Sequence, residues 1–183
     1  MFIFIAGMTR SGKSSYAEHR LLALAENTAS VLGRDCPKIY IATAQIHAHD
    51  SEMLARVHLH KTRRKGMGFT TIECQRDLGR LTIPEDACVL IESLTLWTAN
   101  EMFRDSAVNH SAGAKIYSDI MSIHSRAKNL VLVSDDVFSD GAEYDPLTEE
   151  YMRTLGGLHV KIAAFADEVI EIVSGIPLRY PVI

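Results

Sequence analysis

The segment Gly7-Met8-Thr9-Arg10-Ser11-Gly12-Lys13-Ser14 matches the pattern G-x-x-x-x-G-K-[S/T] and decides the fold class of this chain. The apolar run Phe2–Ala6 precedes it, and helical spacing follows from Ser14 to about Asn27. A glycine-rich turn between a strand and a helix directs backbone N–H groups at phosphate oxygens, and the helix adds the positive end of its dipole. The segment therefore predicts a phosphate-binding loop for a purine nucleoside triphosphate.

Two side chains of this loop have predictable roles in nucleotide chemistry. Lys13 is expected to reach the β- and γ-phosphates, and Ser14 to ligate Mg²⁺. An acidic residue that helps to hold the metal should end a neighbouring strand. The apolar run Val89–Glu92 ends in such a residue, Glu92. A solvent-facing Glu92 is the alternative, and Asp135-Asp136 after the next apolar run is a second candidate. The N-K-x-D motif of guanine-specific switches is absent from the sequence, which favours a small enzyme over a signalling GTPase.

Strand and helix patterns alternate along the chain. Further strands are predicted at Lys38–Ala42, Phe69–Glu73, Ala87–Ile91, Asn129–Ser134 and Glu168–Val173. Further helices are predicted at 50–61, Ala114–Lys128 and Thr148–Ala166, the last with a possible break at Gly156-Gly157, and polar loops at Arg104–Gly113 and Ser139–Pro146. Continuous apolar strands suit a parallel sheet covered on both faces. We expect one domain over residues 1–183, an α/β P-loop NTPase-type fold with a doubly wound, mostly parallel, RecA-like sheet.

Charge, hydropathy and cysteine content indicate which classes of partner and which compartment the protein is suited to. The 183 residues carry a net charge of −4, which argues against general nucleic-acid binding. The apolar runs are too short to span a membrane, and the first residues do not form a signal peptide. The widely spaced Cys36, Cys74 and Cys88 fit reduced thiols of a cytoplasmic protein.

Several segments resemble, in order, the adenosylcobinamide kinase / adenosylcobinamide-phosphate guanylyltransferase family of cobalamin biosynthesis. They are the extended loop Gly7–Glu18, Tyr40–Ala44, Asp50-x-Glu-Met-x-x-Arg56-Val-x-x-His60-Lys61, Val89–Trp97 with Asn100, and Ala163-x-x-Ala-Asp167-x-Val with Ser174–Leu178. The resemblance implies a bifunctional transferase. In an enzyme of that family, ATP or GTP phosphorylates a hydroxyl group of the corrinoid. GMP is then transferred from GTP, through a guanylyl-histidine, to the new corrinoid phosphate.

The resemblance also implies roles for particular residues. His60 corresponds to the guanylylated histidine, and a neutral imidazole is a suitable nucleophile at pH 7. Further nucleotide or metal contacts fall on Thr43, Lys61, Arg63, Arg64, Glu73 and Glu92. On a helix Glu52, Arg56 and His60 share one face, so Arg56 would steer a triphosphate toward His60. The family resemblance further suggests a homo-oligomer.

Alternatives remain open at several positions. His60 is otherwise a surface histidine, or part of a metal site suggested by His47-x-His49-Asp50, and His58 is the spare nucleophile candidate. Trp97 is expected in the core rather than under a nucleobase.

The sequence departs from the family in its C-terminal third, at Asp135–Gly141, Met152-Arg153 and His159-Val160, and Phe69 replaces a usual tryptophan. These departures keep two other functions open: a P-loop kinase with another acceptor, and a nucleotide-binding protein without catalysis.

Overall fold

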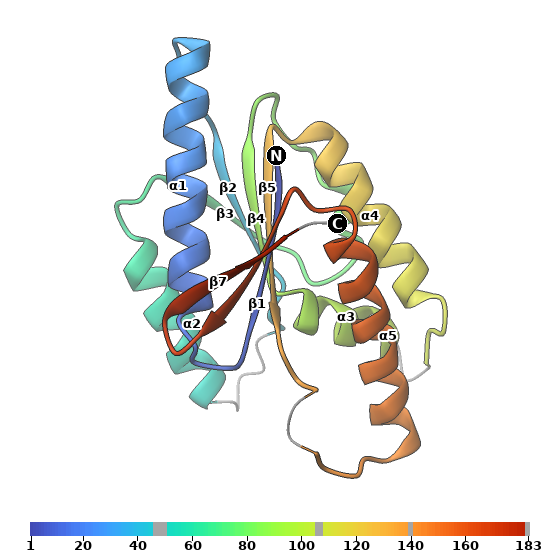
Figure 1. Ribbon diagram of the computed structural model, residues 1–183. Coiled ribbons are helices and arrows are strands. Elements are labelled where there is room, and N and C mark those ends of the chain that lie inside the picture. Colours follow the sequence, from blue (N-terminus) through green and yellow to red (C-terminus); the bar gives the residue numbers. More distant parts are fainter. Residues whose placement is uncertain (46–50, 105–107, 139–140, 182–183) are drawn as a thin grey trace.

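A seven-stranded sheet forms the centre of the computed structural model, with strand order β3-β2-β4-β5-β1-β6-β7 in the described residues (Figure 1). The structure describes residues 1–45, 51–104, 108–138 and 141–181, without the side chains of 51–53, 56 and 60. The strands are β1 (Phe2–Gly7), β2 (Lys38–Ala42), β3 (Phe69–Glu73), β4 (Cys88–Glu92), β5 (Asn129–Asp135), β6 (Glu168–Val173) and β7 (Ile176–Tyr180). Neighbouring strands from β3 to β6 pair in parallel, and β7 pairs antiparallel to β6.

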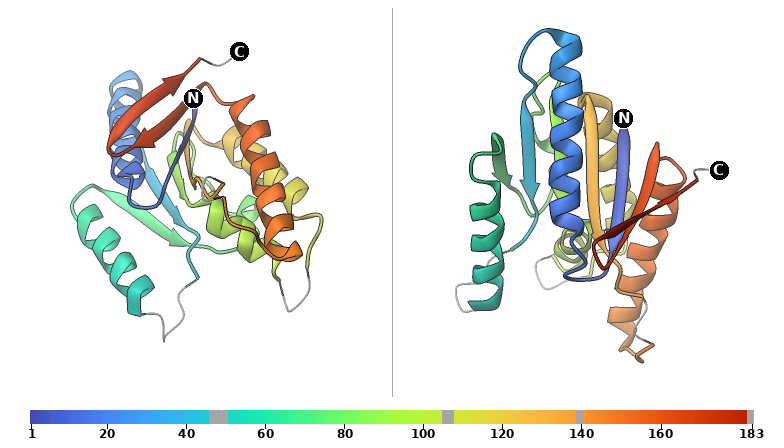
Figure 2. Two further views of the ribbon diagram at one scale, coloured as in Figure 1. Left: turned by 60° about the horizontal axis from the view of Figure 1, so that its bottom comes forward. Right: turned by 60° about the vertical axis from the view of Figure 1, so that its left-hand side comes forward.

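Helices cover both faces of this sheet. They are α1 (Lys13–Leu32), α2 (Ser51–Arg64), α3 (Leu94–Met102), α4 (Ala112–Arg126) and α5 (Pro146–Ala163), with a short 3₁₀ turn at Leu78–Arg80. Helix α1 lies on one face, α3, α4 and α5 lie on the other, and α2 stands at the β3 end of the sheet (Figure 2). The predicted α/β class with a doubly wound, mostly parallel sheet is confirmed, and the RecA-like kind of sheet stays a prediction.

The core lies in two layers because central strands are buried on both faces. In β1, Phe2 and Phe4 pack with residues of α4 and α5, whereas Ile3 and Ile5 pack against α1. This accounts for the continuous apolar run that starts the chain. Trp97 is fully buried in the α4 and α5 layer, which confirms its prediction as a core residue.

Three features differ from the sequence predictions. The helix α5 runs unbroken through Gly156-Gly157, because the flanking Leu155 and Leu158 are buried in the core. The helix α3 and the strand β7 were not predicted, and α4 begins at Ala112, inside the segment predicted as a loop. None of the helices in the described part of the chain has the length and apolar character needed to cross a bilayer.

Candidate functional site

The carboxyl ends of the parallel strands place three predicted site segments at one edge of the sheet. Gly7 pairs in register with Asp135, and Ala42 pairs with Glu92. Open α/β sheets bind ligands outside this edge. The topology therefore brings together the phosphate loop, the acid that ends β4 and the acid that ends β5.

The phosphate loop has the backbone geometry that its glycines predict. An ideal Cβ on Gly7 would lie 2.7 Å from the backbone oxygen of Ile172 in β6, so the close approach of the loop to that strand requires glycine. Gly12 has φ 94° and caps the N-terminus of α1 without a side chain. The first N–H groups of α1 are thus available to an anion.

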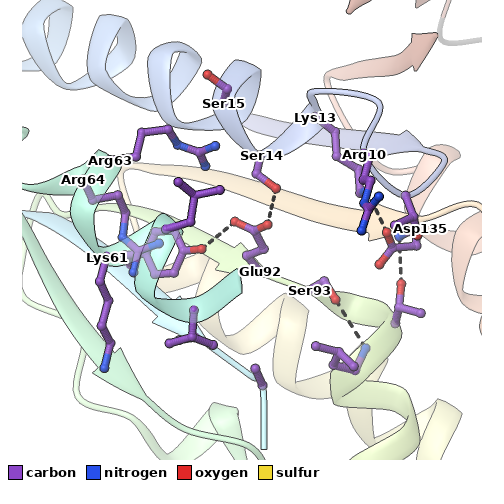
Figure 3. A pocket seen from close by; sticks show the side chains of 18 of the residues that line it. Arg10, Lys13, Ser14, Ser15, Lys61, Arg63, Arg64, Glu92, Ser93 and Asp135 are labelled. Atoms are coloured by element: carbon purple, nitrogen blue, oxygen red, sulfur yellow. Dashed lines mark hydrogen bonds and ion pairs between the residues drawn. The ribbon is translucent and has the colours of Figure 1, made fainter. Parts of the chain in front are cut away.

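Lys13 is buried at the start of α1 and pairs with the acid at the end of β5. Its Nζ lies 2.6 Å from Asp135 Oδ1 and donates to the backbone oxygen of Met8 at 3.1 Å. The ammonium group therefore lies within the loop, beside a carboxylate. Asp135 was the weaker of the two acids considered from the sequence, and the structure places it beside Lys13 (Figure 3).

Ser14 and Glu92, the two predicted metal ligands, are in direct contact. Ser14 Oγ donates a hydrogen bond to Glu92 Oε1, and the Tyr40 hydroxyl donates to Glu92 Oε2 (Figure 3). Mg²⁺ in phosphoryl-transfer sites usually takes one or two protein ligands, with phosphates and waters completing the shell. The donor set of one hydroxyl and one carboxylate fits that ion. Burial and the Glu92 carboxylate raise the pKa of Tyr40, so the phenol remains a donor.

Thr43 lies beneath this surface and is fully buried. Its Oγ1 donates to the Ser93 carbonyl at 2.8 Å and accepts from the Ser93 backbone N–H at 2.7 Å. Asn100 Nδ2 donates to the Thr43 carbonyl at 2.8 Å. In this structure Thr43 joins the end of β2 to the turn after Glu92.

The predicted cations of α2 have different surroundings. Arg63 donates two hydrogen bonds to the buried Glu18 of α1, at 2.7 and 2.9 Å. The guanidinium carbon of Arg64 lies 3.6 Å from the centre of the Tyr40 ring, and its Nη1 lies 3.8 Å from Glu18 Oε1. Lys61 is half exposed and forms a 2.6 Å ion pair with Glu73 at the end of β3.

The position of His60 is on α2, one residue before Lys61. The side chains of Glu52, Arg56 and His60 lie outside the described residues, as does the whole of His47-x-His49-Asp50. His58 is described and exposed on the same helix. Among the described side chains, groups of three or more His, Cys, Asp or Glu that could hold a metal are absent.

One cavity of about 700 Å³ joins the phosphate loop to α2. Lys13, Ser14 and Glu92 line one end of it, and Lys61, Arg64 and Glu73 line the other. This volume is typical of a small-ligand site. The structure thus brings most of the described candidate residues to one cavity wall. Those that do not line it are Gly7, Met8, Ser11 and the buried Thr43.

Sequence reasoning missed Tyr40, which lines this cavity, and Glu18, which is buried behind it and pairs with the arginines of α2. Glu18 was noted only as the end of the family segment after the phosphate loop, and Tyr40 only as the start of another. A charged residue four positions after Ser14 on the same helix was an available signal, since it shares a face with Ser14. The partner of Glu18 is distant in sequence, so the contact itself was not predictable.

A family model described as cobinamide kinase / cobinamide phosphate guanyltransferase matches residues 3–180. The bifunctional adenosylcobalamin biosynthesis protein CobU of Salmonella typhimurium is 32% identical, over 98% of this chain and 99% of that protein. The bifunctional adenosylcobalamin biosynthesis protein CobP of Pseudomonas aeruginosa is 29% identical, over 95% of this chain and 94% of that protein.

Among solved structures, the KaiC-like protein PH0186 of Pyrococcus horikoshii aligns with a TM-score of 0.46 and 11% identity, over 93% of this chain and 71% of that chain.

Proposed function

Since the chain belongs to the cobinamide kinase / cobinamide phosphate guanyltransferase family, we propose that it phosphorylates adenosylcobinamide and then transfers GMP from GTP to the resulting phosphate. The observation that carries this proposal is the single cavity shared by the phosphate loop and the basic end of α2. One end has the groups for holding a triphosphate, and the other has the cations next to position 60. Both half-reactions therefore have their chemistry in reach of one bound nucleotide.

In the kinase step, the loop Gly7–Ser14 holds the triphosphate and Lys13 neutralises charge on its terminal phosphates. The corrinoid hydroxyl attacks the γ-phosphorus, the bond to the β-phosphate oxygen breaks, and the hydroxyl proton leaves to solvent. Ser14 and Glu92 would hold Mg²⁺, which supplies electrostatic stabilisation of the phosphates. For Lys13 to reach a phosphate, its 2.6 Å contact with Asp135 must lengthen or be shared.

In the guanylyl step, an imidazole nitrogen of His60 attacks the α-phosphorus of GTP and pyrophosphate leaves. A phosphate oxygen of the corrinoid phosphate then attacks the guanylyl-histidine, which forms the new diphosphate bond and frees the imidazole. The cations Lys61 and Arg64 line the cavity beside this position and would offset charge on the transferred group. Glu73, paired with Lys61, would orient it toward the nucleotide.

The first experiment is intact mass spectrometry after incubation with Mg²⁺ and GTP. Wild type and His58→Ala are expected to gain one GMP, and His60→Ala is expected to gain none. His58 is the matched control because it is exposed on the same helix, two positions away. An adduct on His60→Ala would contradict the assignment of His60 and place the nucleophile at another residue. No adduct on a folded wild type that binds GTP would contradict guanylyl transfer and leave a kinase or a binding protein as the function.

We also propose that the protein is a homo-oligomer. The strand β7 ends the sheet, and its Ile176, Leu178 and Tyr180 are 63%, 43% and 48% exposed. Apolar side chains along an open sheet edge favour association with another chain. Light scattering of the eluting peak should give a multiple of the 20.3 kDa chain mass, and a monomer at working concentration would contradict this proposal.

We further propose a cytoplasmic location for the enzyme. Cys36 and Cys88 are free and buried with their sulfur atoms 3.3 Å apart, and Cys74 is also free. Thiols that stay unpaired at this distance suit a reducing compartment. Fractionation of cells that express the tagged chain tests the location.

A further inference from the structure

Glu18 is a fully buried carboxylate on α1 whose charged partners come from α2. Buried carboxylates are rarely tolerated unless they are paired and hydrogen-bonded. Glu18 meets this condition through two hydrogen bonds from Arg63, at 2.7 and 2.9 Å, and through the charge of Arg64 at 3.8 Å. A two-pronged arginine–carboxylate contact fixes orientation as well as distance.

The contact between Glu18 and Arg63 joins the two helices that carry the predicted phosphate-binding and guanylyl-transfer residues. Glu18 lies four residues after Ser14, on the helix that starts in the phosphate loop. Arg63 lies three residues after His60, on the helix that carries the predicted nucleophile. Residues three apart on a helix are neighbours. Fixing Arg63 therefore also fixes the position of α2 along its axis, and its rotation about that axis, at residue 60.

A second series of contacts runs from the same helix to the candidate metal ligands. The Arg64 guanidinium lies over the Tyr40 ring, and the Tyr40 hydroxyl donates to Glu92, which accepts from Ser14. Arg64 is only 7% exposed, and its Nε and Nη1 have no hydrogen-bond acceptor among the described residues. Its charge is therefore held by the aromatic face and by Glu18, so Glu18 anchors both arginines.

We propose that Glu18 is a positioning residue for guanylyl transfer, which holds α2 at the distance from the phosphate loop that the α-phosphorus of bound GTP requires. The inference rests on the proposed function. A displacement of about 1 Å from the reacting geometry can slow a reaction about a hundredfold, so loss of this anchor should act on rate. In the phosphate loop, Lys13 pairs with Asp135 of β5 and Gly7 lies against Ile172 of β6, so these parts are held by the sheet and not by α2. Triphosphate binding and the kinase step should therefore persist.

The test compares Glu18→Gln with Glu26→Gln, which removes an exposed carboxylate from the same helix. With saturating Mg²⁺ and GTP, we expect Glu18→Gln to form the GMP adduct at least tenfold more slowly than wild type. Its dissociation constant for GTP and its kinase rate with adenosylcobinamide should stay within about threefold, because the loop is untouched. Glu26→Gln should match wild type in all three measurements.

The double variant Glu18→Gln/Arg63→Gln separates positioning from general damage. If Glu18 acts through Arg63, the double variant should be no slower than the slower single variant, since coupled residues are not additive. Should Glu18→Gln fail to fold, Arg63→Lys keeps the charge but loses one of the two contacts, and it should slow adduct formation selectively.

Two results would overturn the inference. One is an adduct rate within twofold of wild type in the folded variant, and the other is an equal loss in the kinase and adduct steps. Absence of the adduct in wild type would instead contradict the proposed function itself, and this inference with it.

Discussion

Lys13 is the residue on which phosphoryl transfer should depend most. Lys13 is 6% exposed, and its ammonium group is held at the loop by Asp135 and the Met8 carbonyl. We expect Lys13→Ala to lower the kinase rate at least a hundredfold, because the charge that stabilises the transferred phosphoryl group is removed. Steady-state turnover with adenosylcobinamide measures this, and the exposed Lys128→Ala serves as the control. A loss below tenfold would show that Lys13 is not in the reacting site.

His159 should make stability depend on pH. Its Nε2 is hydrogen-bonded to Ser134 Oγ at 2.7 Å, and its ring lies against the rings of Phe4 and Phe138. Burial lowers the pKa of His159 from 6.5 to about 4. Because the folded pKa lies below the unfolded one, protons bind the unfolded chain first, and stability is lost as pH falls from 6.5 to 4.

From pH 7 to pH 5 this single group should cost about 2 kcal/mol of unfolding free energy. Urea unfolding of wild type and His159→Gln at both pH values measures it. The variant should be less stable at pH 7 but should lose less on acidification, since the titrating group is gone. The lowered pKa of His124 acts in the same direction in both proteins and cancels in the comparison. Equal losses in both proteins would contradict the assignment.

At the scale of single residues, the sequence predicted the pairing of Ser14 with Glu92 because each follows from a pattern around it. The loop motif places Ser14, and an apolar strand ending in an acid places Glu92. The Glu18–Arg63 and Arg64–Tyr40 contacts were not predictable, because each joins residues on separate elements. Which acid or ring meets which arginine depends on where the fold places α2 relative to α1 and β2, and no local sequence pattern specifies this.

At the scale of elements, α5 contains Gly156 and Gly157, and the burial of neighbouring residues offsets the destabilising effect of these glycines on the helix. An ideal Cβ on Gly157 would contact nothing within 4 Å. We therefore expect Gly157→Ala to raise the free energy of unfolding by about 1 kcal/mol, because alanine costs less backbone entropy in a helix. Denaturant unfolding checks this. Gly33→Ala is the contrasting variant, since Gly33 has φ 68° at the end of α1 and should lose stability.

The two elements that were not predicted have sequence patterns that differ from the usual ones. The helix α3 is buried on several sides, including Leu94, Trp97 and Met102, so its residues show no polar face to mark the helical period. The strand β7 is exposed throughout and contains Pro177, which normally argues against a strand. It forms because β6 offers an antiparallel neighbour, and Pro177 is tolerated at the sheet edge. By contrast, β2, β3 and β6 match their predicted bounds, since each is a short run rich in β-branched and aromatic residues.

At the scale of the whole molecule, one cavity for both steps implies competition between nucleotides. We expect a non-hydrolysable ATP analogue to raise the apparent KM for GTP in adduct formation without changing the limiting rate. At ten times its inhibition constant the KM should rise about elevenfold by mass action. Initial rates of adduct formation over a GTP series measure this. A lowered limiting rate at constant KM would indicate a separate nucleotide site.

The shared cavity also has a consequence for the order of events in a catalytic cycle. The nucleoside diphosphate left by the kinase step occupies the space that GTP needs for the guanylyl step. Each round then contains an obligatory nucleotide exchange, during which the phosphorylated corrinoid must either stay bound or dissociate and return. The lifetime of that intermediate on the protein, rather than the speed of either chemical step, would then decide how much of it escapes into solution.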